Sequence, residues 1–133
     1  MERHKIKILD TNNPSYEHVI EYMYSKLPAF SRIGAAAYKE GLGNIVALCK
    51  HLGNPQEKFP AIHIAWTNGK GSTSSLIAYA LISNNYKTGI YTSPHVRDFR
   101  ERITINGIYI PQEKVIEFIV NNQQKIEEIQ PSF

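Results

Sequence analysis

The chain has 133 residues, room for one ordinary domain, and its 42% hydrophobic and 20% charged residues are typical of a soluble globular protein. A net charge of +3, scattered along the sequence, suits an anionic small ligand and argues against a nucleic-acid surface. A single cysteine excludes an internal disulfide, and the sequence shows neither a membrane-spanning run nor a secretory signal, so we expect a cytoplasmic protein.

Two helices are predicted in the first part of the chain. The first begins at Asn13-Pro14, with the asparagine as its cap, and ends at Pro28. The second covers Asn44–Leu52 and is ended by Gly53-Asn54-Pro55. Between them, Ala29–Gly43 mixes aromatic and basic side chains with glycines. This segment is either a substrate contact or a connector, and composition does not decide between the two.

The centre of the chain is a glycine-rich segment between a predicted strand and a predicted helix. The apolar run Ala61–Trp66 is β-prone, Thr67–Ser72 reads Thr-Asn-Gly-Lys-Gly-Ser, and Thr73–Ser83 is compatible with a helix. Such a turn places backbone N–H groups at a helix N-terminus, where the dipole favours an anion. Gly69 and Gly71 would let a phosphate approach the backbone without a Cβ in the way. The pattern predicts a phosphate-binding loop.

Lys70 gives this loop its charge. The lysine is placed to reach the terminal phosphates, while the hydroxyls of Ser72 and Thr73 are candidates for ligating Mg²⁺. We also expect Ser72 to cap the helix under the phosphates. The match to the general phosphate-loop pattern is partial, since Ile64 replaces its first glycine and Gly71 replaces its Ser or Thr. The alternative is a glycine-rich turn with a solvated lysine.

A second strand is predicted over Lys87–Thr92. Strand, helix and strand within this length imply a right-handed parallel crossover, with ligands bound at the carboxyl ends of the strands. Thr67–Ser72 and Thr92–His95 should therefore face one another. His63, on the first strand, is expected to be a core histidine.

The remaining elements follow from local patterns. Asp98–Arg102 is charged and is interpreted as a solvated face. Asn106-Gly107 between two apolar runs predicts a β-hairpin with a type I′ turn. Pro111 opens a last helix over Gln112–Gln130, with an apolar stripe at helical spacing.

Several stretches together resemble one family. The sequence is similar to folylpolyglutamate synthase/dihydrofolate synthase, a member of the Mur-ligase-like ATP-dependent ligases. The family has glycine before its Thr-Asn-Gly-Lys where this chain has Trp66, and it is several times longer. The chain thus resembles the N-terminal part alone, without the family's metal-binding glutamate, and is expected to be inactive by itself. The stretches that carry the resemblance are residues 30–52, 67–72, 91–95, 99–103 and 106–107.

The resemblance implies a fold. It is an α/β, P-loop-type three-layer sandwich with a parallel sheet, like the central domain of Mur ligases. Residues 1–58 would form a helical lead-in with a substrate-side loop. Residues 59–133 would hold the phosphate-loop βαβ unit, a β-hairpin and a helix. The C-terminal domain would be absent.

The resemblance also implies a reaction. ATP would phosphorylate a carboxylate of dihydropteroate or folate, and the amino group of glutamate would attack the acyl phosphate, giving an amide, ADP and phosphate. The expected partners are these small molecules, with no nucleic acid or membrane, and we expect a monomer. ATP and Mg²⁺ are the implied cofactors.

Individual residues take roles by their match to the family's motifs. Ser93 would ligate Mg²⁺, whereas His95 is expected to make a structural hydrogen bond. Ala37, Tyr38, Lys39 and Glu40 match the segment that contacts the pterin substrate. Lys70 is the catalytic candidate. The triphosphate would be held by Thr67, Asn68, Gly69, Lys70, Gly71 and Ser72.

Two other functions remain open. One is a nucleotide-binding module without turnover, in which Trp66 fills or distorts the phosphate pocket; the alternative for this ring is the adjacent sheet face. The other is a peptidoglycan-type Mur ligase, which shares the loop. Phe99–Arg102 and Asn106-Gly107 favour the folate branch over the latter.

Overall fold

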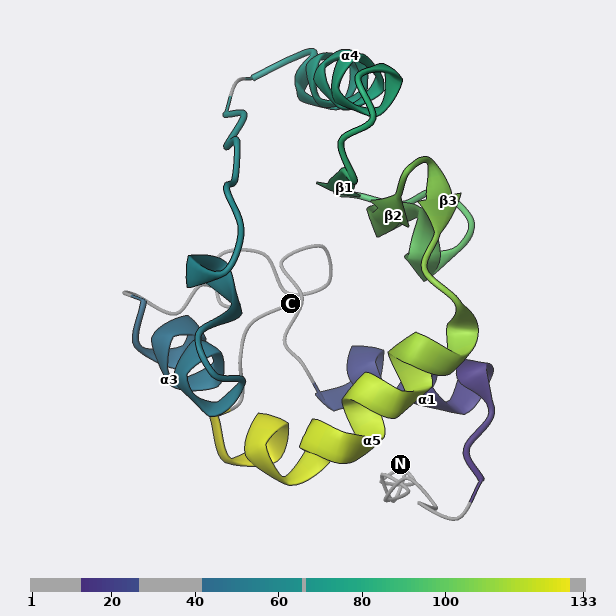
Figure 1. Cartoon of the computed structure of the whole chain (residues 1–133). Coiled ribbons are helices and arrows are strands. Elements are labelled where there is room, and N and C mark those ends of the chain that lie inside the picture. Colours follow the sequence, from purple (N-terminus) through teal and green to yellow (C-terminus); the bar gives the residue numbers. More distant parts are fainter. Residues whose placement is uncertain (1–12, 27–41, 66, 130–133) are drawn as a thin grey trace. The chain divides into compact units, whose positions relative to one another are not determined.

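The structure, a computed structural model, describes residues 13–26, 42–65 and 67–129, which divide into two compact units (Figure 1). The first unit contains residues up to Pro60 together with those from Val115 onward, and the second is Ala61–Lys114. The first unit is thus assembled from two segments far apart in the sequence. Its elements are α1 (Tyr16–Lys26), α3 (Gly43–His51), the 3-10 helix η2 (Pro55–Glu57) and most of α5 (Gln112–Ile129).

Helix α1 begins later than Asn13-Pro14 predicts. The hydroxyl of Ser15 accepts a hydrogen bond from the backbone N–H of His18 at 3.3 Å, so Ser15 is the cap. Pro14 then precedes the cap and does not open the helix. The predicted end at Pro28 lies outside the described residues.

Helix α3 ends as its sequence predicts. Gly53 has φ +73°, a left-handed conformation that favours glycine, and its N–H donates to the carbonyl of Lys50 at 3.2 Å. The N–H of Asn54 donates to the carbonyl of Cys49 at 2.8 Å. These two bonds form a Schellman motif, which satisfies carbonyls at the end of the helix.

The core of the first unit lies on α1 and α5. Apolar side chains at helical spacing on each helix are buried: Val19, Tyr22 and Met23 on α1, and Val115, Ile119 and Ile126 on α5. The Tyr22 hydroxyl donates to the Glu127 carboxylate at 2.9 Å, and His51 shares a hydrogen bond with Asn122 at 3.1 Å. Burial, together with the bond to Glu127, raises the pKa of Tyr22. These bonds tie α1 and α3 to α5.

Replacing Tyr22 with phenylalanine is expected to lower the free energy of unfolding by about 1 kcal/mol, because the half-buried Glu127 bond is lost while the ring stays buried. Urea unfolding measures the change. Tyr79→Phe removes the same hydroxyl from a side chain that is 62% exposed and is the control. Equal stability of Tyr22→Phe and the wild type would show that this bond is energetically neutral.

The second unit holds a three-stranded sheet in the order β1-β2-β3, with both pairs antiparallel. Asn106 and Gly107 connect β2 to β3 with φ +51° and +77°, the signs that a type I′ turn requires, so the predicted hairpin is confirmed. The elements of this unit are α4 (Lys70–Ser83), β1 (Gly89–Tyr91), the 3-10 helix η3 (Phe99–Arg102), β2 (Ile103–Ile105) and β3 (Ile108–Tyr109).

The predicted parallel pair is not present in the described residues. Residues 61–65 form no strand, and β1 pairs antiparallel with β2 instead. Parallel strands are stable where both faces of a sheet are covered, whereas Ile62 and Tyr91 are 65% and 69% exposed here. His63 is likewise exposed, so its prediction as a core histidine is wrong. The coarser prediction of a mixed α/β chain holds.

Candidate functional site: the start of helix α4 and the segment after strand β1

Helix α4 begins at Lys70, three residues before the predicted start. Gly69 is its cap, with φ +81° and ψ 0°, and the N–H of Thr73 donates to the Gly69 carbonyl at 2.9 Å. No side chain caps the helix, so Ser72 does not have the predicted capping role. The N–H groups of Gly71 and Ser72 precede the first repeating helical bond and lie at the positive end of the dipole.

The backbone at this helix start is open. Within the part of the chain that the structure describes, and apart from the flanking backbone, a Cβ added at Gly69 or Gly71 would meet no atom within 4 Å. No described side chain therefore crowds the backbone at these two residues. The left-handed conformation of Gly69 favours glycine, whereas Gly71 lies inside α4 without a positive φ.

The ammonium group of Lys70 lies beside the loop. Its Nζ donates to the carbonyl of Thr67 at 3.3 Å, so the side chain bends back across the residues before the helix. The hydroxyl of Ser74 donates a hydrogen bond to the Lys70 carbonyl within the helix, at 2.8 Å. Thr67, Asn68 and Lys70 are all exposed. A basic group, a helix N-terminus and two glycines thus share one surface.

The segment after β1 carries Ser93, which is exposed. His95 lies two residues later, and its Nδ1 accepts a hydrogen bond from Nε of Arg102 at 2.7 Å. This bears out the predicted structural hydrogen bond of His95. Because a guanidinium only donates, Nδ1 is the unprotonated nitrogen in this arrangement. The ring of Phe99 stacks edge-on to His95 at 6.1 Å between centroids.

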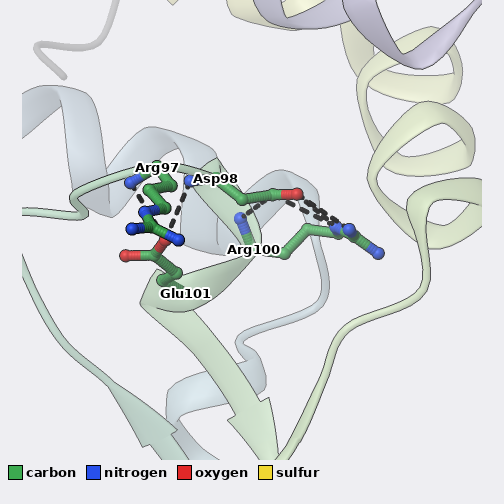
Figure 2. A network of polar contacts seen from close by, with 4 residues as sticks. All are labelled: Arg97, Asp98, Arg100 and Glu101. Carbon is green, nitrogen blue, oxygen red and sulfur yellow. Dashed lines mark hydrogen bonds and ion pairs between the residues drawn. The ribbon is translucent and has the colours of Figure 1, made fainter.

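Glu101 is a residue of this site that the sequence interpretation missed. Its carboxylate accepts hydrogen bonds from the backbone N–H groups of Val96 at 2.8 Å and of Arg97 and Asp98 at 2.9 Å each. The Asp98 side chain in turn accepts from the Arg100 N–H at 2.8 Å (Figure 2). Asp98 and Glu101 also form a capping box at η3, in which each side chain accepts from the backbone N–H of the other residue. The interpretation of Asp98–Arg102 as a solvated face is therefore wrong, and the Asp-x-x-Glu spacing is the signal that reveals it.

These bonds stabilise the ionised form of Glu101. The backbone N–H groups of Val96 and then Asp98 hold the pKa of Glu101 below its usual range. The stabilisation is present above the unfolded-state pKa of about 4.3 and is lost as the pH falls through the lower folded-state pKa. This contribution to the stability of the turn is therefore present at neutral pH and lost in acid.

The arrangement of the other predicted site residues stays a prediction. Ala37 to Glu40 and Trp66 lie outside the described residues. Thr67–Ser72 and Ser93 belong to the same unit, and that they face one another stays a prediction. Among the described residues no three His, Cys, Asp or Glu side chains cluster to hold a metal, and no described helix is long and apolar enough to cross a membrane.

Comparison with known proteins identifies relatives of the chain. No protein-family model matches it. A probable dihydrofolate synthetase of Schizosaccharomyces pombe is 52% identical over 73 residues, which are 55% of this chain and 18% of that protein. The folylpolyglutamate synthase structure of Thermotoga maritima is 38% identical with a TM-score of 0.69, over 88% of this chain and 27% of that one. A folylpolyglutamate synthase complex with AMPPCP and folate is 28% identical with a TM-score of 0.67, over 87% and 27%.

The chain is similar to folylpolyglutamate synthases and dihydrofolate synthases. It spans about a quarter of the length of the folylpolyglutamate synthase structures that it matches. The structural likeness includes most of both units, so the site described above lies within a folylpolyglutamate synthase-like fold.

Proposed function

We propose that the chain supplies the phosphate-binding part of an ATP-dependent ligase that adds glutamate to dihydropteroate or folate. The observation that carries the proposal is the open N-terminus of α4, where Gly69 in a left-handed conformation is followed by Lys70. A folylpolyglutamate synthase complex with AMPPCP, an ATP analogue, and folate supports both substrates. The names of the relatives support the folate branch over a peptidoglycan-type ligase.

The proposed reaction requires a carboxylate to become a better electrophile. Phosphoryl transfer from ATP to the substrate carboxylate gives an acyl phosphate, and the glutamate amine displaces phosphate to form the amide. The protein contributes positioning and charge neutralisation. Thr67, Asn68 and the amides of Gly71 and Ser72 would hold the triphosphate, with Lys70 neutralising the charge that develops on the transferred group.

Ser93 would hold Mg²⁺ through its hydroxyl, and the remaining ligands would be phosphate oxygens and water. Mg²⁺ is a hard cation that prefers oxygen ligands of this kind. Ser93 is exposed, so that a metal ion with its phosphate and water ligands can reach it. When bound, Mg²⁺ neutralises charge on the phosphates. Ala37 to Glu40 would contact the pterin part of the substrate.

The finer fold is part of the proposal. In a complete sandwich, Ala61–Trp66 and Gly89–Tyr91 would be neighbouring parallel strands, with residues 1–58 as the lead-in and 59–133 as the nucleotide-binding part. Exposed apolar side chains on α4 and β1, including Leu76 and Tyr91, support the need for further covering elements. A cytoplasmic, monomeric protein is consistent with small soluble substrates.

The chain by itself is expected to bind MgATP and to form no ligation product. Its loop would hold the phosphates, whereas a chain that spans about a quarter of the folylpolyglutamate synthase structure it matches would supply only part of the active site. Isothermal titration calorimetry should show saturable heat that AMPPCP displaces, and a folate–glutamate ligation assay should stay at background. Absence of MgATP binding would contradict the proposed phosphate loop, and ATP-dependent product from the chain would contradict the need for the remaining elements.

Replacing Trp66 with glycine is expected to tighten MgATP binding. The family that the sequence resembles has glycine where this chain has Trp66. An indole beside the turn would take space near the phosphates and would not adopt positive φ cheaply. Calorimetry on the two forms measures the change in Kd. Equal affinities would show that the ring is accommodated away from the pocket and that Gly69 and Gly71 suffice.

A further inference from the structure

The segment from Thr92 to Asp98 is held at several points by two neighbouring residues, Glu101 and Arg102. At its start, the Thr92 N–H donates to the Arg102 carbonyl at 2.9 Å, and the Thr92 hydroxyl reaches the Glu101 carbonyl at 3.5 Å. In its middle, the Arg102 side chain donates to His95. At its end, the Glu101 carboxylate accepts the three N–H groups of residues 96–98.

Ser93 lies inside this held segment, between Thr92 and His95. Three converging N–H donors on one carboxylate fix the path of the chain more firmly than one bond would, since the two oxygens of Glu101 are both used. In Figure 2 the Glu101 side chain points back to the chain at Arg97 and Asp98, from the turn that leads into β2. The Glu101 carboxylate therefore binds backbone N–H groups of the segment, and Ser93 stays exposed.

We propose that Glu101 is a positioning residue that holds the segment Thr92–Asp98 so that the Ser93 hydroxyl is set for Mg²⁺ bound to ATP. The inference rests on the proposed function for the identity of the ion. The holding of the segment rests on the hydrogen bonds alone. Residues that orient a metal ligand commonly change metal affinity about 10- to 100-fold when they are replaced.

The first experiment measures the holding of the segment without any nucleotide. Amide hydrogen exchange of Val96, Arg97 and Asp98 is followed by NMR in the wild-type chain, in Glu101→Gln and in Glu113→Gln. The glutamine offers one acceptor oxygen and places an NH₂ group against N–H donors, so exchange at these three amides should be about tenfold faster. Glu113→Gln removes the same charge from an exposed residue of α5 and should leave the three amides unchanged.

The second experiment separates positioning for the metal from general damage. Calorimetry compares ATP binding with Mg²⁺ and with EDTA. Glu101→Gln should weaken MgATP binding at least tenfold and leave metal-free ATP binding unchanged, because the loop at α4 is intact. Equal weakening in both conditions would overturn the positioning role, as would unchanged MgATP affinity.

Glu101→Asp keeps the charge and covers the case in which the glutamine variant fails to fold. Its exchange rates should lie between those of the wild type and Glu101→Gln, and an aspartate variant as impaired as the glutamine one would overturn the role of the carboxylate charge. Wild-type protein that binds no MgATP would contradict the proposed function, and the exchange result would still show whether Glu101 holds the segment. Unchanged exchange in Glu101→Gln overturns the inference in either case.

Discussion

Lys70→Ala is expected to lower the affinity for MgATP about a hundredfold while leaving α4 folded. The variant removes the positive charge that lies beside the loop. A bound triphosphate would cover this ammonium group, and loss of one partner of a covered charge pair typically has an effect of this order. Alanine is the best helix former, so the first turn of α4 should not suffer. Calorimetry gives the affinity, and far-ultraviolet circular dichroism reports the helix content. In an active synthase that contains this segment, turnover should fall by a similar or larger factor.

Lys87→Ala provides the matched control. This lysine is exposed, belongs to the same unit and precedes β1, so its removal changes the net charge equally. Its MgATP affinity should stay within about twofold of the wild type, since an exposed charge is screened by salt. Equal effects of the two variants would show that Lys70 acts only through the net charge, and an unaffected Lys70→Ala would remove the nucleotide from this loop.

Alanine substitutions at Gly69 and Gly71 are expected to have opposite effects on stability. Gly69→Ala should destabilise the chain by about 1–2 kcal/mol, because its φ of +81° places a Cβ in the left-handed region. Gly71→Ala should stabilise it by about 0.5–1 kcal/mol, because Gly71 is helical and an added Cβ meets no neighbour. Thermal or urea unfolding measures both changes.

Binding should nevertheless fall in both variants. At Gly71 the added methyl group occupies the space that a phosphate would use, so a more stable protein should bind MgATP more weakly. Higher stability together with weaker binding would show that Gly71 is needed for the ligand and not for the fold. If Gly71→Ala binds MgATP as well as the wild type, phosphate does not approach the backbone at this residue.

The features that the sequence predicted correctly depend on local chemistry. Asn106-Gly107 supplies positive φ at two successive positions, and this alone selects the hairpin turn. Gly53-Asn54 ends α3 through bonds within one turn of the helix. Pro111 and the apolar spacing after it were enough to place α5 to within one residue at its end.

The features that the sequence does not predict are of two kinds. Some depend on contacts between segments distant in the sequence, and others depend on helix caps. Ile62 and its neighbours were predicted as a strand from composition, but a parallel strand also needs neighbours and covered faces. The burial of Tyr22 depends on α5, which no local pattern around α1 reveals. Ser15, two residues after Asn13, is the actual cap of α1. The charges of Asp98–Arg102 predict a solvated face, whereas the spacing of Asp98 and Glu101 is that of a capping box.

The two units differ in the sequence separation of the residues that they bring into contact. In the second unit, the backbone N–H of Thr88 meets the side chain of Asn106 across 18 positions, and β2 and β3 are joined by a tight turn. In the first, Tyr22 meets Glu127 across 105 positions. The entropy of closing the longer loop costs about 1.5 kcal/mol more, by the logarithmic dependence on loop length. Contacts of low sequence separation also form faster. We therefore expect the sheet unit with Lys70 and Ser93 to fold first, and the helical unit to be completed when α5 packs against α1.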